Sequence, residues 1–289
     1  MTVVTLPSPD VLVDVACEVG EGPCFDPRTG SFVWVDITRG TLHELVLESG
    51  HHQTTTVNTA LGAVAPRASH PGFAAATAEG FGFIQDGLLS ITDPCLPESE
   101  LRMNDAKVDA RGRLWAGSTE YGFTAGRGRL HRWDGVEASD VQAEGFTLPN
   151  GLGWSPEGTT MYLVDSMTHD IFSAAFDVDD GTAGTFAPWA KVESGLPDGL
   201  AVDAEGCLWV AVWGAGEVLR FSPTGTLVAR VVMPVSQPSS CAISPTGTLY
   251  ITSARAGLTD QALAIEPHAG AVFTVEIGVP GVPVNSMGA

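Results

Sequence analysis

Basic residues are scarce in this 289-residue chain, which has 14 Lys and Arg against 34 Asp and Glu and a formal net charge of −20. Nucleic-acid binding depends on cations that neutralise phosphates, so nucleic acid is a poor candidate partner. No apolar stretch approaches the 18 residues that a membrane-spanning helix needs, and the N-terminus lacks the apolar core of a secretory signal. We therefore expect neither a nucleic-acid partner nor a membrane partner.

Cysteine is also rare. The five cysteines are odd in number, widely scattered and form no C-x-x-C pair, which argues against a disulfide framework and against a cysteine-based zinc site. We expect reduced, mostly buried thiols and a cytoplasmic location. The chain also lacks a G-x-S-x-G motif, which excludes an α/β-hydrolase that uses a serine nucleophile.

Glycine and proline, by contrast, are abundant, and six copies of one pattern follow one another. Each copy has an Asp or Ser, two or three further residues, a Gly and then an apolar run. The copies are DPRTGSFVWVD (26–36), SHPGFAAAT (69–77), DARGRLWAG (109–117), SPEGTTMYLVD (155–165), DAEGCLWVA (203–211) and SPTGTLYIT (244–252). Their glycines are 42, 40, 46, 48 and 41 residues apart. This period is typical of propeller blades or helical solenoids.

The composition of the copies favours strands over helices. Trp, Tyr, Val, Ile and Thr stand in short runs that Gly and Pro interrupt, and D-x-x-G is a turn signal. We predict an all-β fold, a six-bladed β-propeller of four-stranded antiparallel blades, which forms one domain over residues 1–289. The segment 11–16 is expected to pair with the last strands, 271–277, and so to close the ring of blades.

The innermost strand of each blade lines the central channel and lies just before the D-x-x-G turn. The residue five positions before each turn's Asp or Ser is therefore expected at the same height in every blade. We call these six positions the inner ring; they are Glu21, Val64, Asn104, Asn150, Asp198 and Ser239.

Four side chains of the inner ring carry oxygen atoms that could bind a hard cation: Glu21, Asn104, Asn150 and Asp198. Two carboxylates close together in a narrow channel are costly unless they are protonated, solvated or bound to metal. The oxygen-only set suits Ca²⁺, Mg²⁺ or Mn²⁺ best, and carboxylates also bind Zn²⁺. The alternative is a polar channel that holds only ordered water.

Five segments together resemble the gluconolactonase and regucalcin (senescence marker protein) family of six-bladed propellers. They are CEVGEGPCFD (17–26), RMNDAKVDARGRLWAGS (102–118), LPNGLGWSPEGTTMYLVDS (148–166), LPDGLAVDAEGCLWVAVWG (196–214) and QPSSCAISPTGTLYITSARAG (237–257). Five motifs in the same order make a specific match from about residue 17 onward. The resemblance implies one divalent metal and hydrolysis of sugar lactones.

Transferred residue by residue, the family's metal ligands correspond to Glu21, Asn150 and Asp198. Its substrate-binding residues correspond to Arg102 and Asn104, and an acidic substrate contact to Glu120. Asp198 would also act as the general base. Asp165 and Ser166 are expected to support the inner ring from behind, and the Gly-rich segment 121–129 to lie over the channel mouth, where loop composition sets specificity.

The expected function is therefore metal-dependent hydrolysis of an aldonolactone to the free sugar acid, with Ca²⁺ favoured over Zn²⁺, Mn²⁺ and Mg²⁺. Two alternatives stay open: an esterase of other substrates, such as aryl esters or organophosphates, and a calcium-binding propeller without catalysis. The expected partner is a small sugar lactone, and the protein is expected to be a monomer or a small homo-oligomer. The sequence alone identifies neither the sugar nor the lactone ring size.

Overall fold

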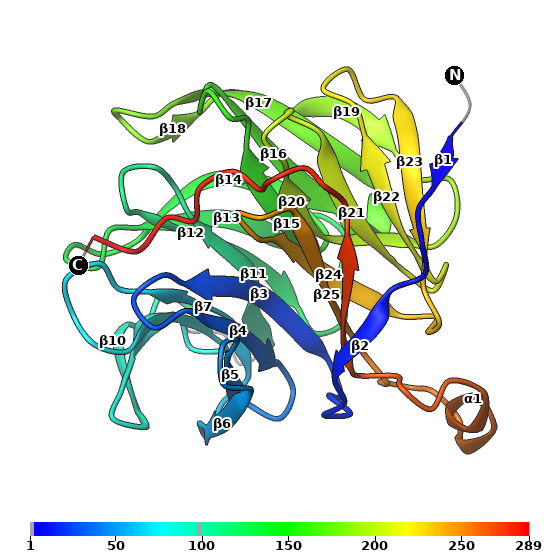
Figure 1. Ribbon diagram of the computed structural model, residues 1–289. Helices are drawn as coiled ribbons and strands as arrows, with labels where there is room; N and C mark the ends of the chain where they lie inside the picture. The colour runs from blue at the N-terminus through cyan, green and yellow to red at the C-terminus, as the bar shows by residue number, and fades with distance from the viewer. Residues whose placement is uncertain (1–2, 97–99, 289) are drawn as a thin grey trace.

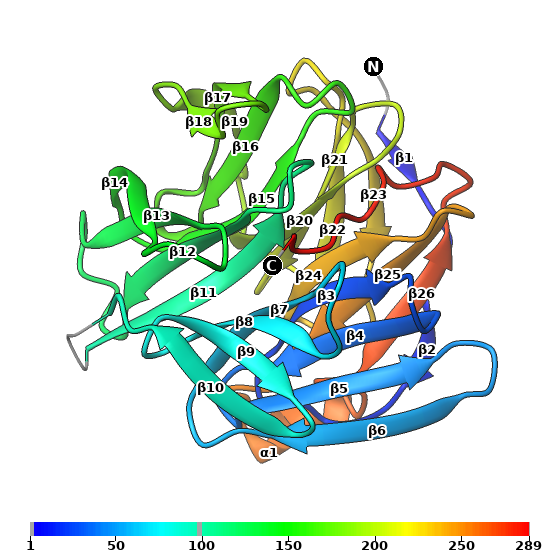
Figure 2. The same ribbon diagram turned by 90° about the vertical axis from the view of Figure 1, so that its left-hand side faces the viewer.

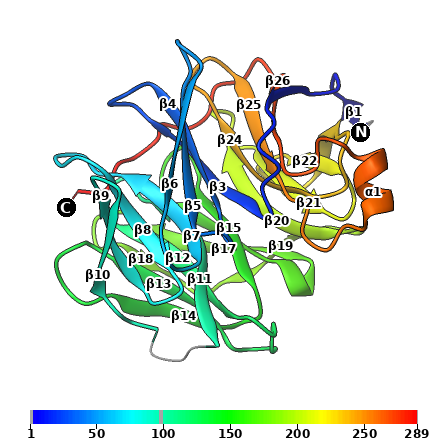
Figure 3. The same cartoon turned by 90° about the horizontal axis from the view of Figure 1, so that it is seen from below.

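A computed structural model describes residues 3–96 and 100–288 of the chain; residues 1–2, 97–99 and 289, which the predicted domain includes, lie outside the described residues. In the described part, six antiparallel sheets are arranged around a central axis (Figure 2), which confirms the predicted six-bladed β-propeller. The α-helical content there is one short peripheral helix, α1 (Asp260–Ile265) (Figures 1 and 3). No helix among these residues is long and apolar enough to cross a membrane.

Each blade begins with its innermost strand and proceeds outward along the chain. Blade one has β3 (Gly20–Asp26), β4 (Ser31–Asp36), β5 (Thr41–Val46) and β6 (His51–Thr56). Blade two has β7 (Leu61–Pro66), β8 (Phe73–Thr77), β9 (Phe81–Gln85) and β10 (Leu88–Asp93). Blade three has β11 (Leu101–Val108), β12 (Leu114–Glu120), β13 (Gly128–Trp133) and β14 (Asp140–Phe146).

Blades four to six follow the same plan with additions. Blade four has β15 (Pro149–Trp154), β16 (Thr160–Asp165), a 3₁₀ turn η1 (Ser166–Thr168), β17 (Asp170–Asp177), β18 (Thr182–Ala183) and β19 (Ala187–Lys191). Blade five has β20 (Leu196–Val202), β21 (Leu208–Trp213), β22 (Glu217–Phe221) and β23 (Leu227–Val232). Blade six has β24 (Pro238–Ile243), β25 (Thr248–Ser253) and β26 (Val272–Glu276), with β2 (Asp10–Val13) as its outer strand.

The two ends of the chain are joined in blade six, as expected. β2 pairs antiparallel with β26, with Asp10 opposite Thr274 and Val13 opposite Val272. An additional strand, β1 (Val4–Thr5), pairs in parallel with β23 and widens blade five, which the sequence pattern did not predict. The N-terminal segment therefore connects blades five and six.

The Asp of the repeated turn does more than cap the backbone. In blade three, Asp109 accepts hydrogen bonds from the backbone N–H groups of Arg111 and Arg113 and, at 2.9 Å, from the indole Nε1 of Trp115. In blade five, Asp203 and Trp209 repeat this contact at 2.9 Å. Each of these turns is thus tied to a fully buried Trp of its blade core, which accounts for the recurrence of Asp and Trp six residues apart.

The glycine that follows an inner-ring residue permits close contact between neighbouring inner strands. A Cβ on Gly199 would lie 1.9 Å from Oγ of Ser240 in blade six, and a Cβ on Gly151 would lie 2.4 Å from the backbone nitrogen of Leu200 in blade five. Any larger side chain at these positions would push the blades apart. The inner strands of neighbouring blades are therefore crowded around the channel.

Blade two differs from the predicted register. Its hairpin closes with Pro66 opposite Phe73, whereas that of blade three closes with Val108 opposite Leu114. The unpaired bulge residue that corresponds to Asn104 is therefore Gly62, not Val64. Val64 instead packs in the core between blades one and two. The prediction of Val64 was wrong because Ser69 does not directly follow the inner strand of blade two. Arg67 and Ala68 stand between Pro66 and Ser69, whereas Asp109 comes immediately after Val108 in blade three.

Candidate active site

The inner ring of the structure lies on the first strand of every blade, near the end of the channel where these strands begin. Its six residues are Glu21, Gly62, Asn104, Asn150, Asp198 and Ser239, and the five side chains among them are at most 7% exposed. Each lies at a β-bulge, where one or two residues of the inner strand have no partner in the second strand. A β-bulge changes the direction in which a side chain points, and the inner strands of all six blades have their bulges at the same level of the channel.

Glu21 and Asp198 form a close pair of buried carboxyl groups. Their side chains lie within hydrogen-bonding reach of each other, and Oε2 of Glu21 also accepts the backbone N–H of Gly22 at 2.8 Å. Burial raises the pKa of Glu21 well above its usual range, and repulsion from Asp198 adds to the effect. Burial and the carboxyl group of Asp105 raise the pKa of Asp198 in the same way. The pair therefore requires a proton or a cation.

Asn150 is the third member of the predicted ligand set and lies beside Asp198. Its Nδ2 donates to Oδ1 of Asp198 and, at 3.1 Å, to Oγ of Ser166. These two donations leave its Oδ1 buried without a hydrogen-bond partner. An unpaired buried carbonyl oxygen is costly, and the site offers an acceptor where a cation ligand is expected. The three groups thus fit a divalent cation of the oxygen-binding class.

Two aspartates hold the inner strands that carry Glu21 and Asn150. Asp165, at the end of β16, accepts the backbone N–H groups of Thr147 and Leu148, just before Asn150. Asp36, at the end of β4, accepts those of Glu18 and Val19, just before Glu21. The expected support from Asp165 and Ser166 is confirmed. The same role of Asp36 was not predicted from the sequence. It could have been, because WVD (34–36) in blade one and LVD (163–165) in blade four share the ending Val-Asp.

Arg102 and Asn104 lie together on β11. The Nη1 atom of Arg102 donates to Oδ1 of Asn104 at 2.6 Å and to the carbonyl oxygen of Met103 at 3.1 Å. Nδ2 of Asn104 donates to the carbonyl oxygen of Pro149 at 3.1 Å. Both amide atoms of Asn104 are therefore engaged, and its direct effect in this structure is to orient the Arg102 guanidinium.

Glu120 lies at the end of β12, opposite Leu101 of β11, and so at the rim of the channel near Arg102. Its Oε1 is 3.6 Å from Nε of Arg127 in the segment 121–129, and this ion pair ties the segment to the rim. Tyr121, which the sequence pattern did not single out, is half exposed and its ring centre lies 5.9 Å from the guanidinium carbon of Arg102. The rim thus presents a cation, a carboxylate and an aromatic ring.

Two charged residues in the channel beyond the inner ring were also missed. Asp105, next to Asn104, is buried with its Oδ2 unpaired, and burial raises its pKa, while Lys107 acts in the opposite direction. Nζ of Lys107 donates across the channel to the carbonyl oxygen of Leu200. Strict alternation along NDAK (104–107) would place Asp105 and Lys107 on the face opposite Asn104. The sequence pattern missed them because the β-bulge between Met103 and Ala106 breaks this alternation.

A second group of potential ligands, Asp203, Glu205 and Cys207, lies at the turn of blade five, outside the channel. The guanidinium of Arg220 already neutralises this group, with Nη2 2.6 Å from Oδ2 of Asp203 and 2.7 Å from Oε2 of Glu205. Asp203 also caps the turn and accepts the Trp209 indole. These contacts explain the carboxylates without a metal.

Comparison with known proteins places the chain in a family. A family model described as "SMP-30/Gluconolactonase/LRE-like region" matches residues 19–255. The L-arabinolactonase of Azospirillum brasilense is 33% identical, over 92% of this chain and 91% of that protein. The 6-deoxy-6-sulfogluconolactonase of Pseudomonas putida is also 33% identical, over 91% and 92%.

Solved structures give the same result. A calcium-binding protein, regucalcin, from Agrobacterium tumefaciens has a TM-score of 0.91 at 28% identity, and the match covers 100% of this chain and 99% of that chain. A luciferin-regenerating enzyme has a TM-score of 0.89 at 26% identity, over 98% and 100%. The chain belongs to the SMP-30/gluconolactonase/LRE-like family.

Proposed function

We propose that this protein is a carboxylic ester hydrolase that opens a sugar lactone to the free sugar acid and that depends on one divalent metal. The observation that carries the metal proposal is the unpaired, buried Oδ1 of Asn150 beside the carboxyl groups of Glu21 and Asp198. These three residues would hold the metal, as the family resemblance implies. The full-length similarity to the arabinolactonase and the sulfogluconolactonase supports the choice of substrate class.

The ligand chemistry favours Ca²⁺, with Zn²⁺, Mn²⁺ and Mg²⁺ as alternatives, because all the ligand atoms are oxygens. The name of the related regucalcin, a calcium-binding protein, supports this order. When bound, the cation would polarise the lactone carbonyl and stabilise negative charge on its oxygen.

Three side chains at the channel mouth would position the lactone. Arg102, already oriented by Asn104, presents further N–H donors to the carbonyl or hydroxyl oxygens of the sugar. Glu120 accepts hydrogen bonds from sugar hydroxyls, and its ion pair with Arg127 holds it at the rim. The ring of Tyr121 gives the mouth an apolar face against which a sugar ring can pack.

Asp198 would act as general base. It would accept a proton from the water that attacks the lactone carbonyl carbon. The ring C–O bond would then break, and Asp198 would return this proton to the ring oxygen, which becomes a hydroxyl group. Burial and the carboxyl group of Asp105 raise the pKa of Asp198, and a cation beside it would favour the ionised carboxylate that a general base needs. The activity is therefore expected to depend on a bound cation.

The test is hydrolysis by metal-stripped protein, with Ca²⁺, Mg²⁺, Mn²⁺ and Zn²⁺ each added back. The substrate panel contains five- and six-membered aldonolactones, an aryl ester and an organophosphate. We expect hydrolysis of at least one aldonolactone, restored by metal and faster than that of the aryl ester. Full lactonase activity without metal would contradict the proposal, and a clear preference for the aryl ester or the organophosphate would replace the substrate class.

The remaining expectations accord with this function. All five cysteines are unpaired, which supports the expected reducing, cytoplasmic compartment. The net charge of −20 supports the absence of nucleic acid among the partners. The sugar and the ring size remain to be determined by the panel, and the oligomeric state by light scattering.

A further inference from the structure

The end of the channel opposite the inner ring contains a cavity of about 270 Å³. It begins next to Glu21, at Gly22, and the inner strands of all six blades contribute to its wall. Residues 281–285 of the C-terminal tail line it from the outside. This tail crosses the face of the propeller that lies opposite the inner-ring residues (Figures 1 and 2). There Val282 N donates to Val202 O at 3.1 Å and Gly288 N to Gly112 O at 3.0 Å.

The wall of this cavity is mostly apolar but carries two hydrogen-bond donors of interest. Phe25, Val64, Phe176 and Val282 are among its apolar residues, and of the lining residues that the structure describes only Lys107 is charged. Nε1 of Trp154, another lining residue, is buried and has no hydrogen-bond partner. The ammonium group of Lys107 also donates to the carbonyl oxygen of Leu200 and interacts with the carboxyl group of Asp105. Together with the unpaired indole N–H of Trp154 it gives a mostly apolar wall two donors, and ligand sites use such donors to fix the polar end of a small molecule.

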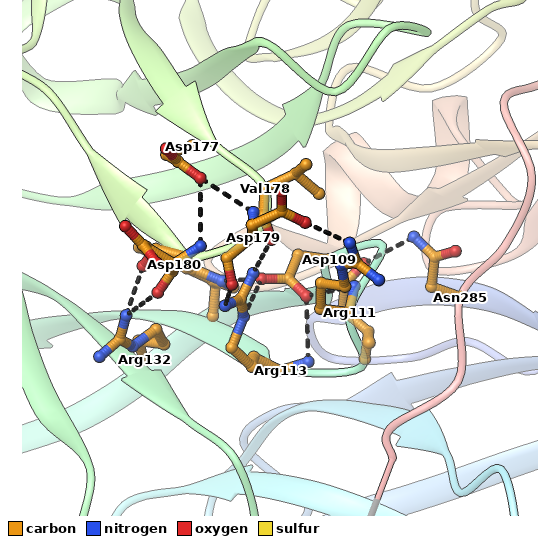
Figure 4. Close-up of polar contacts among 12 residues, drawn as sticks. Asp109, Arg111, Arg113, Arg132, Asp177, Val178, Asp179, Asp180 and Asn285 are labelled. Carbon is orange, nitrogen blue, oxygen red and sulfur yellow. Dashed lines mark hydrogen bonds and ion pairs between the residues drawn. The ribbon is translucent and has the colours of Figure 1, made fainter.

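The rim of the cavity between blades three and four is held rigidly. Nη2 of Arg113 donates to the carbonyl oxygen of Val178 at 2.6 Å, and its Nε donates to Oδ2 of Asp109 at 2.7 Å. Nδ2 of Asn285 in the tail donates to the carbonyl oxygen of Val108 at 3.3 Å. Figure 4 shows these contacts around Arg113 and Asn285. The cavity is thus a pre-formed space bounded by anchored segments.

We propose that this cavity is a second binding site, separate from the channel mouth, for a small apolar monocarboxylate such as an aromatic or branched-chain carboxylic acid. The apolar body would lie against Phe25, Phe176 and Val282, and the carboxylate would accept hydrogen bonds from Lys107 and Trp154. A carboxylate is favoured over a neutral acceptor because its charge is opposite to that of the one charged lining residue. A sugar lactone fits poorly, since most of its hydroxyl groups would lack partners.

Calorimetric titration of the metal-loaded full-length protein with benzoate, 4-methylpentanoate and the neutral isostere benzamide tests this site. Lys107 and Lys191 are the two lysines of the chain, so Lys191→Met is a matched control for Lys107→Met. We expect Lys107→Met to weaken the binding of the carboxylates about tenfold or more, as loss of a charged hydrogen bond does, and Lys191→Met to leave it unchanged. Benzamide should bind wild type more weakly than benzoate.

Two further variants keep the test decisive. Trp154→Phe keeps an aromatic side chain but removes the five-membered ring with its N–H, so it should weaken binding without unfolding the protein. Arg102→Met probes the channel mouth and should leave binding unchanged. Three outcomes would overturn the proposal: no binding of either carboxylate, equal binding of benzamide and benzoate, or binding that is lost in Arg102→Met and kept in Lys107→Met.

Discussion

Asn150 shows why one carboxamide accompanies two carboxylates in the proposed metal site. A third carboxylate beside Glu21 and Asp198 would add repulsion to two groups whose pKa values are already raised. The amide instead donates to Asp198 and Ser166 and keeps its oxygen available. Two negative charges and one neutral ligand balance a dication and leave coordination sites for water or substrate.

Replacement of Asp198 by Asn should remove the proposed base at nearly constant size. We expect kcat for the lactone to fall by about 10² to 10⁴, the range usual for a general base, while the circular dichroism spectrum stays unchanged. Asp203→Asn is the matched control, because Asp203 lies outside the channel; it should lower the melting temperature and spare the activity. Activity retained in Asp198→Asn would remove this residue from the mechanism.

The raised pKa values of Glu21 and Asp198 predict how pH affects the metal-free protein. Their usual values are 4.5 and 3.8, and both are raised on folding, so the fold holds protons that the unfolded chain has lost. The contribution of this pair to stability is then complete at low pH and falls as pH rises from the usual pKa values toward the raised ones. We expect the melting temperature of the metal-free wild type, relative to that of Glu21→Gln, to decline from pH 5 to pH 8, and the increase caused by added metal to grow over the same range.

Differential scanning fluorimetry with and without a chelator measures both effects. Glu21→Gln removes one carboxyl group of the pair and with it the need for a shared proton, so it is the reference variant in which the other titrating groups are unchanged. If added metal raised the melting temperature equally at pH 5 and pH 8, this would contradict the proposal that Glu21 and Asp198 share a proton in the metal-free protein.

The inner strands could be placed largely from the sequence pattern, whereas the contacts between blades could not. The D-x-x-G turns predicted five of the six inner-ring positions, because in those blades the Asp or Ser of the turn ends the inner strand or directly follows it. Blade two failed because Arg67 and Ala68 separate Ser69 from the end of its inner strand at Pro66, so that Gly62 lies in the ring instead of Val64. Contacts between blades, such as those of Asn104 with Pro149 and Lys107 with Leu200, join residues far apart in sequence, so no local pattern reports them.

A histidine between two strands of blade three provides a test of the packing there. Nε2 of His131 on β13 is 2.8 Å from Oγ of Ser118 on β12, and burial lowers the pKa of His131 from 6.5 to about 4. Since the folded pKa is lowered, the stability contribution is complete above pH 6.5 and is lost as pH falls toward 4. The loss amounts to about 3 kcal/mol over this window.

His131→Gln keeps a hydrogen-bonding group near Ser118 and removes the titration. We expect urea unfolding at pH 7.5 and 4.5 to show a smaller loss of stability on acidification for this variant than for wild type. His70→Gln, at an exposed turn, is the control and should behave as wild type. An equal pH dependence in wild type and His131→Gln would show that His131 is not buried as described.

The N-terminal and C-terminal segments join the blades of the propeller at two places. β2 and β26 join the N-terminal and C-terminal parts within blade six, which the sequence predicted. The tail that follows β26 then crosses the far face and bonds to blades five, six, two and three. This second closure could not be predicted from the sequence, because residues 279–288 have neither a repeat nor an alternating pattern and are held mainly through their backbone.

A chain that ends at Gly278 should measure the contribution of the tail. It loses backbone hydrogen bonds such as Met287 N to Pro66 O at 2.8 Å, and it exposes the site of the fully buried Met287. We expect the free energy of unfolding to fall by roughly 5 kcal/mol. Removal of residues 1–5, which include the exposed strand β1, should cost much less, and an equal cost for the two truncations would contradict this account.

The most direct test of the proposed metal site is anomalous diffraction from crystals of the protein soaked with Mn²⁺. We expect one strong anomalous peak on the propeller axis, within coordination distance of oxygens of Glu21, Asn150 and Asp198. A peak at Asp203, Glu205 and Cys207, or no peak in the channel at saturating Mn²⁺, would contradict it.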